Sequence, residues 1–129
     1  MYDSDPQFEG TWEMMRAETD GEASMDLLAL GVVLRLADGQ YSVRFGGELA
    51  DRGHYTFSPG NATALTLTGA EGPNAGRTIP CLYQLMGNRL RICYGLDGEA
   101  PTSFVTKDTP HRYLAIYRRQ VAEKANGEP

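Results

Sequence analysis

The sequence has few of the side chains that bind metals or form disulfide bonds. It contains two cysteines and two histidines among 129 residues. His54 and His111 have no His-x-His or Cys-x-x-Cys spacing around them, so no metal site is expected. Cys81 and Cys93 fall on opposite faces of adjacent predicted strands, so their Cβ atoms are expected to point apart. No disulfide is predicted, and reduced thiols agree with a cytoplasmic protein.

Basic side chains and long apolar runs are also scarce. The chain carries 12 lysines and arginines against 17 aspartates and glutamates, which gives a net charge of −5. Because such a surface repels polyanions, neither nucleic acid nor an anionic membrane is an expected partner. The longest apolar stretch, Leu27–Leu36, is interrupted by Gly31 and Arg35 and is shorter than the roughly 20 residues of a membrane span. No basic segment followed by an apolar one opens the chain, so no secretory signal is expected and the predicted location is the cytoplasm.

Known catalytic and cofactor-binding motifs are missing as well. The sequence has no nucleophile with an adjacent base and no serine in a glycine elbow. The loop Gly72–Thr78 contains glycines, but their spacing is one residue short of a phosphate-binding P-loop. It also joins two predicted strands, where a P-loop needs a strand and a helix. We interpret it as a wide turn with glycine at positive φ, and no cofactor is predicted.

Glycine and proline, in contrast, are abundant. The chain has 15 Gly and 7 Pro, which separate short apolar stretches without a tandem period, as turn residues do. This spacing predicts an all-β meander. One domain is expected over residues 8–120, because a chain of this length has room for one core. The polar ends, residues 1–7 and 121–129, are expected to be flexible.

Alternating apolar and polar residues define the strands, and turn dipeptides fix their register. Asp38-Gly39 is a type I′ turn sequence, and pairing across it places six apolar residues on one face. Gly87-Asn88 predicts a second hairpin by the same test, and Ser58–Asn61 predicts a third. The predicted pairs are Leu36 with Tyr41, Leu34 with Val43, Val32 with Phe45, Leu85 with Leu90, Tyr83 with Ile92 and Cys81 with Tyr94. In the third hairpin, the strand that contains Gly53, Tyr55 and Phe57 is predicted to pair with the strand that contains Leu65, Leu67 and Gly69.

Four further segments complete the meander. The first strand is predicted over Thr11–Thr19 and the last clear strand over Tyr113–Arg119. Between them, the apolar spacing of Glu22–Leu30 predicts one or two turns of helix, which act as a lid or a side cover. Thr102–Lys107 is a candidate for a short extra strand.

Eight such strands, or nine or ten with the short segments, each have one apolar face to bury. Closure into an antiparallel up-and-down β-barrel buries that face and removes both sheet edges. Binding sites commonly lie on long loops carried by a rigid scaffold, so a ligand is expected to enter where the long loops gather. Alternating strand directions place the tight turns 38–39, 58–64 and 87–88 at one end and the longer segments 20–31, 46–51, 70–77 and 95–111 at the other.

Several stretches resemble a known family: Gly10-Thr11-Trp12, Asp51-Arg52-Gly53, Glu71–Thr78 and Leu90–Tyr94. Gly-x-Trp on the first strand, with Arg118 or Arg119 on the last, resembles the lipocalin and wider calycin pattern. The chain looks like the small lipocalin-like domains of planctomycetes and other bacteria. The resemblance implies a barrel in which Trp12 fills the closed end and the arginine packs across it, but no particular reaction or ligand. A guanidinium on the indole face adds a cation–π contact of roughly 0.5–2 kcal/mol.

The leading hypothesis is non-catalytic binding of a small, mostly apolar ligand by the inward residues nearest the long loops. Aromatic faces with few polar groups suit such a molecule, with its polar end at Arg16 or a phenol. Gly53 and Gly69 are expected to leave space there, although an eight-stranded barrel is also narrow enough to be filled by its own side chains. Arg16 and Glu18 either pair inside this end or lie solvated at its edge. The predicted ligand-binding residues are Met14, Arg16, Glu18, Val32, Phe45, Tyr55, Cys81, Tyr83 and Tyr94.

Two other functions remain open. One is a protein-interaction module with a filled barrel, in which outward apolar residues bind a partner or a second copy as a homodimer. On the last strand this hypothesis assigns Tyr113 and Tyr117 to the outer face and Leu114 and Ile116 to the inner face. The other is an enzyme that uses the charged pair named above and the tyrosines as acid and base groups. The predicted outward apolar residues are Met15, Val33, Leu82, Met86, Tyr113 and Tyr117.

Overall fold

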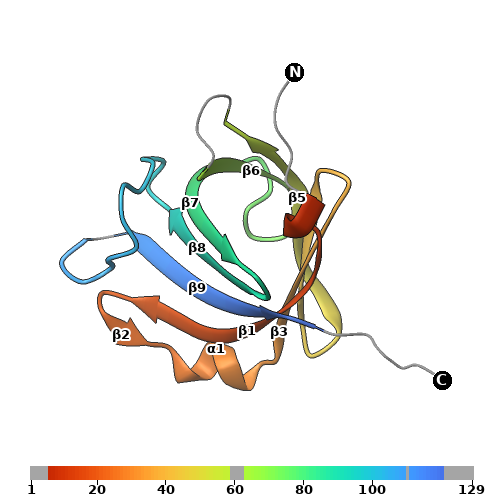
Figure 1. The fold of residues 1–129 in the computed structure, drawn as a ribbon, viewed down its shortest axis with the longest axis horizontal. Coiled ribbons are helices and arrows are strands. Elements are labelled where there is room, and N and C mark those ends of the chain that lie inside the picture. Colours follow the sequence, from red (N-terminus) through yellow and green to blue (C-terminus); the bar gives the residue numbers. More distant parts are fainter. Residues whose placement is uncertain (1–5, 59–62, 110, 121–129) are drawn as a thin grey trace.

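The computed structural model describes residues 6–58, 63–109 and 111–120 and is an all-β fold. Eight strands form a closed antiparallel barrel, and a two-residue strand, β2, pairs with the end of β1 (Figure 1). Among the described residues, no helix has the length and apolar character needed to cross a membrane. The elements are η1 Pro6–Phe8, β1 Gly10–Thr19, β2 Glu22–Ala23, α1 Met25–Ala29, β3 Val32–Ala37, β4 Gln40–Phe45, β5 Glu48–Phe57, β6 Ala64–Glu71, β7 Thr78–Met86, β8 Arg89–Gly95 and β9 Arg112–Arg119.

The barrel strands follow one another in chain order around the ring. From β3 to β9 each strand pairs with the next, and β1 pairs with both β3 and β9. The ring therefore has no open edge, because the first and last barrel strands hydrogen-bond to each other. This arrangement, visible as a ring of arrows in Figure 1, confirms the predicted up-and-down barrel.

The register predicted at the turns is confirmed. Asp38 and Gly39 have φ values of 54 and 77, as a type I′ turn requires. The inward pairs of β3 with β4 and of β7 with β8 are the predicted ones, and β5 pairs with β6 as predicted. Residues 59–62 of the third predicted turn lie outside the described residues.

The inward and outward faces of the last strand, β9, are the reverse of those predicted. Tyr113 and Tyr117 point into the barrel and Leu114 and Ile116 point out, since Tyr117 pairs with the inward Leu90. The assignment of the two tyrosines to the outer face is therefore wrong. Both faces of β9 carry apolar residues, and Leu114 on the outer face is only 6% exposed. Period-two alternation cannot distinguish two apolar faces.

The β8–β9 connection, residues 96–111, contains no strand among its described residues, so the prediction of a strand at Thr102–Lys107 is wrong. The segment is held by side-chain contacts instead. Thr106 is fully buried, and its hydroxyl donates to Glu18 Oε2 at 2.6 Å and accepts from the Gly21 N–H at 2.9 Å. The Arg91 guanidinium lies 3.8 Å from the centroid of the Phe104 ring.

The segment predicted as a helix over Glu22–Leu30 is divided between β2 and α1. The Ser24 N–H donates to the Ala17 carbonyl oxygen at 2.7 Å, which turns the chain back along β1. Helix α1 packs against β1 on the outside of the ring (Figure 1). It is therefore a side cover of the barrel.

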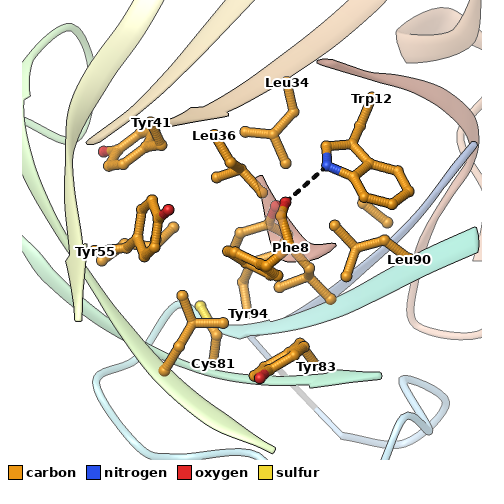
Figure 2. Packing of buried hydrophobic residues seen from close by; sticks show 14 of the residues in the cluster. Phe8, Trp12, Leu34, Leu36, Tyr41, Tyr55, Cys81, Tyr83, Leu90 and Tyr94 are labelled. Carbon is orange, nitrogen blue, oxygen red and sulfur yellow. Dashed lines mark hydrogen bonds between the residues drawn. The ribbon is translucent and has the colours of Figure 1, made fainter. Parts of the chain in front are cut away.

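The end with the turns 38–39 and 87–88, which we call the closed end, is filled by η1. Phe8 is fully buried there, and its ring centroid lies 5.3 Å from Tyr55, 5.2 Å from Phe57 and 5.0 Å from Tyr83. Figure 2 shows Phe8 at the centre of the buried cluster, with Trp12 Nε1 donating to the Phe8 carbonyl oxygen at 3.1 Å. The N-terminal segment is thus part of the core.

Arg119 joins the last strand to the closed end. Its guanidinium lies 4.3 Å from the Trp12 ring centroid, as the sequence predicted for one of the two final arginines. The same group donates to the Glu9 carbonyl oxygen at 2.9 Å and to the Gln7 carbonyl oxygen. Arg118, the other candidate, is exposed on the outer face.

The predicted flexible ends fall mostly beyond the part of the chain that the structure describes. Residues 1–5 and 121–129 lie outside the described residues. Pro6 and Gln7 form η1 together with Phe8, so the described fold begins before residue 8.

Candidate functional site

The end with the loops 20–31, 46–47, 72–77 and 96–111, which we call the open end, contains a cavity of about 200 Å³. Most of its lining is apolar or aromatic. The closed half of the barrel is packed by the aromatic cluster around Phe8, so the barrel is filled at one end and hollow at the other. The lining residues are Met14, Val32, Leu34, Tyr41, Val43, Phe45, Ala50, Asp51, Leu67, Pro73, Asn74, Ile79, Tyr94, Leu96, Tyr113 and Tyr117.

Strand β5 extends further toward the open end than the sequence predicts. Gly46 and Gly47 have φ values of 59 and 92 and form a two-residue turn, so β5 begins at Glu48. The expectation of a longer connection over residues 46–51 is therefore wrong. A bulge at Ala50 shifts the register between β4 and β5 near this turn.

The Asp51 carboxylate lines the cavity from β5. Asp51 pairs with Val43, whose side chain also points inward, and it has the same parity as Gly53. A Cβ at Gly53 would lie 2.8 Å from the Tyr41 ring, so the glycine allows this ring to lie against β5. Tyr41 and Asp51 therefore form neighbouring polar positions on one wall of an otherwise apolar cavity.

The loop 72–77 folds into the open end and covers part of the cavity. The Gly69 N–H donates to the Arg77 carbonyl oxygen at 2.9 Å, and the Gly76 N–H donates to the Gly69 carbonyl oxygen at 3.0 Å. Gly76 has a φ of 80, as predicted for this turn. A Cβ at Gly69 would lie 1.9 Å from the Asn74 carbonyl oxygen. The prediction that Gly69 and Gly53 leave empty space is wrong, because loop backbone occupies one position and the tyrosine ring the other.

Asn74 connects this loop to the cavity wall. Its Nδ2 donates to Asp51 Oδ2 at 2.9 Å, and its Oδ1 accepts from Arg77 at 3.1 Å. Arg77 also donates to the Leu96 carbonyl oxygen at 2.6 Å. These bonds tie β5, the 72–77 loop and the β8–β9 connection together, and they fix the amide of Asn74 with its donor toward the carboxylate.

Two buried polar atoms of this wall have no hydrogen-bond partner among the described residues, namely Tyr41 Oη and Asp51 Oδ1. Tyr41 is only 3% exposed. Burial, and next the negative charge of Asp51, raise the pKa of Tyr41 to about 12, so the phenol is neutral at physiological pH. The Tyr41 hydroxyl and the Asp51 carboxylate therefore lie near enough to each other to interact electrostatically. Leaving a buried polar group unpaired costs about 1–3 kcal/mol.

The opposite wall, on β8 and β9, carries three tyrosines that contact one another through a hydrogen bond and a ring stack. The hydroxyls of Tyr94 and Tyr117 are 2.8 Å apart, and the rings of Tyr94 and Tyr113 stack with centroids 5.2 Å apart. Burial raises the pKa of Tyr113 to about 12 and raises the pKa values of Tyr94 and Tyr117 well above their ordinary value. These side chains therefore present neutral aromatic surfaces to the cavity.

The structure brings together some of the nine predicted ligand-binding residues and separates the others. Those that line the cavity are Met14, Val32, Phe45 and Tyr94. Those that lie instead in the packed cluster around Phe8, outside the cavity lining, are Tyr55, Cys81 and Tyr83 (Figure 2). The sequence has no periodic signal that places Phe8 inside the barrel, where it packs against Tyr55 and Tyr83 in the closed half.

Arg16 and Glu18 lie on the outer face, so their assignment to the cavity is wrong. A bulge at Met15 reverses the parity of β1, and Ala17 points inward in their place. The two charged side chains form the predicted ion pair at 3.1 Å, with exposures of 47% and 18%. The hydrogen bond from Thr106 and the pairing with Arg16 lower the pKa of Glu18 despite its partial burial. The acid and base set of the enzyme hypothesis is therefore not assembled in the cavity.

The sequence reasoning did not include Tyr41, Asp51 or Asn74 among the ligand-binding residues. Asp51 has a usable signal, because it shares the parity of Gly53 and Tyr55, which were predicted to point inward. Tyr41 was also placed on the inner face. Asn74 lies in an irregular loop, where alternation carries no information.

The remaining expectations concern thiols, metals and the outer face. Cys81 and Cys93 are buried free thiols on adjacent strands, and their predicted placement on opposite faces is confirmed. Across residues 6–58, 63–109 and 111–120, no group of three or more His, Cys, Asp or Glu side chains is arranged to hold a metal ion. Of the six residues predicted to be apolar and outward, Met15, Val33, Leu82 and Met86 remain on the outer face, where Leu114 and Ile116 join them.

No protein-family model, curated protein or solved structure matches this chain. The resemblance to lipocalin-like domains therefore stays a prediction, and the cavity itself is the basis on which a function can be proposed.

Proposed function

We propose that this protein binds a small, mostly apolar molecule in the open end of the barrel, without a catalytic step. The observation that carries the proposal is the cavity of about 200 Å³ above a fully packed closed end. Apolar and aromatic walls with a few converging polar groups are typical of small-molecule sites.

The cavity volume limits the size of the ligand. A dry apolar cavity of about 150 Å³ in another protein is large enough to bind benzene. A cavity of about 200 Å³ therefore suits a single ring with a short substituent, or a branched chain of similar volume. Small ligands of this size have affinities of roughly tens of micromolar to millimolar, because few atoms contribute to binding.

The walls support a preformed site. The loop that covers the cavity is held by Asn74 and Arg77, and the Tyr94 and Tyr117 hydroxyls bond to each other across β8 and β9. A site that is already ordered loses little conformational entropy on binding. Entry is expected between the loops of the open end, since Phe8 fills the other end.

A cavity-filling substitution tests the proposal. Val43→Phe adds a ring to an inward residue of the lining, whereas Val33→Phe adds the same ring to the outer face of the neighbouring strand. Toluene and benzyl alcohol serve as probes at millimolar concentration, followed by ¹H–¹⁵N chemical shifts. We expect the wild type and Val33→Phe to show saturable shifts at the cavity residues and Val43→Phe to show none. Absence of saturable shifts in the wild type, or equal binding by all three proteins, would contradict the proposal.

A further inference from the structure

We propose that the ligand of this cavity is a small primary amine, bound as a cation, whose ammonium group lies between Asp51 and Tyr41 and whose apolar body lies against the aromatic wall. This inference rests on the proposed binding function and adds the chemical class of the ligand. The observation behind it is an acidic side chain that faces an apolar cavity with one carboxylate oxygen unpartnered among the described residues.

No basic side chain of the described residues forms an ion pair with the Asp51 carboxylate. Arg52, its neighbour in the chain, is exposed on the outer face and pairs with Glu71 at 3.0 Å. Arg77 donates to Asn74 and to the Leu96 carbonyl oxygen and forms no ion pair with Asp51. A partly buried carboxylate without a counter-charge is costly, and a ligand that supplies the positive charge removes that cost.

The hydrogen-bonding groups on this wall match an ammonium group. Asn74 already satisfies Asp51 Oδ2, which leaves Oδ1 as the carboxylate oxygen of this lining residue without a partner among the described residues. Tyr41 Oη is the second unpartnered atom, and a neutral phenol oxygen also accepts a hydrogen bond. An ammonium group donates up to three hydrogen bonds, so it can satisfy both oxygens at once, whereas a hydroxyl group has one hydrogen to donate. An anionic ligand would place like charges together and is excluded.

The rest of the cavity defines the ligand's apolar part. Across the barrel from Asp51, the stacked rings of Tyr94 and Tyr113 form a flat aromatic surface, and Leu67 and Ile79 continue the wall. One aromatic or branched aliphatic group fits between these residues and the polar pair. An arylalkylamine with a single ring has both the charge and the volume that the site requires.

Three probes of nearly equal size separate the contributions of charge and shape: benzylamine, benzyl alcohol and toluene, each titrated at neutral pH by ¹H–¹⁵N chemical shifts. Hydrogen bonds to charged groups contribute enough to change affinity by roughly 10- to 100-fold. We expect wild-type protein to bind benzylamine at least about tenfold more tightly than benzyl alcohol. In Asp51→Asn this preference disappears, while benzyl alcohol binds about as well as in the wild type.

The control variant is Glu71→Gln, which removes one negative charge from the outer face of the adjacent strand, away from the cavity lining. It is expected to keep the preference for benzylamine. Equal binding of benzylamine and benzyl alcohol by the wild type overturns the amine assignment and leaves the proposed binding function intact. Failure of all three probes to bind overturns the binding function itself. The comparison of probes in the wild type holds even if Asp51→Asn does not fold.

Discussion

The substitution Phe8→Ala tests whether the η1 segment is part of the core. Phe8 is 0% exposed, and its ring lies 5.0–5.3 Å from three other aromatic rings. Burying a phenylalanine contributes about 1.5–3 kcal/mol, and a favourable aromatic pair adds about 0.5–1.5 kcal/mol. Because Phe8 makes several such contacts, we expect the free energy of unfolding to fall by about 3–5 kcal/mol, as for other buried phenylalanines.

The assay is urea unfolding, followed by the fluorescence of Trp12, whose indole N–H bonds to Phe8. With a slope of about 1.5 kcal/mol per molar urea, this loss lowers the midpoint by roughly 2–3 M. Met86→Ala is the matched control, because Met86 is 65% exposed and its truncation should change stability by less than about 0.5 kcal/mol. If Phe8→Ala unfolds at the same urea concentration as the control, η1 does not pack in the barrel and the reasoning is refuted.

Two further predictions concern pH. Thr106→Val removes the hydrogen bond that lowers the pKa of Glu18, so we expect a loss of about 1–3 kcal/mol at neutral pH. The folded pKa of Glu18 is depressed, so this contribution is lost as the pH falls through it, and urea unfolding of the variant and the wild type should converge in acid. At the alkaline end, burial raises the pKa of Tyr113 to about 12 from an ordinary value of 10.0, so stability decreases as the pH rises between these values. Urea unfolding of Tyr113→Phe should show a shallower alkaline decrease than the wild type, and an unchanged slope would contradict the assigned pKa.

The hairpin registers were predictable because local chemistry specifies them. Asp38-Gly39 adopts the positive φ values of one turn type, and a two-residue loop leaves a single register for the strands on either side. Closure into a barrel followed from the number of strands with one apolar face. The architecture therefore required no knowledge of distant contacts.

The site was less predictable, because single inserted residues decide which face a side chain occupies. The bulge at Met15 moved Arg16 and Glu18 to the outer face, and nothing in the residue types of β1 indicates its position. Phe8 precedes the first strand and has no periodic neighbours, yet it fills the closed half of the barrel and packs against Tyr55 and Tyr83, two of the predicted ligand-binding residues. Asp51 shares the parity of Gly53 and Tyr55, but the prediction assigned it to a connection over residues 46–51 and not to the cavity wall.

The contacts of Arg119 also determine when the barrel can be completed. Its hydrogen bonds to the backbone of Glu9 and Gln7 join residues 110 and 112 positions apart in the chain. The η1 segment, which fills the closed end, is synthesised before the last strand. The arginine side chain that holds this segment in place emerges from the ribosome only with that strand. Contacts of such sequence separation slow folding, so the chain must keep the apolar side chains of the N-terminal strand, such as Trp12 and Met14, from aggregating until the closing strand has been synthesised. The net negative charge of −5 helps to keep the incompletely folded chain soluble.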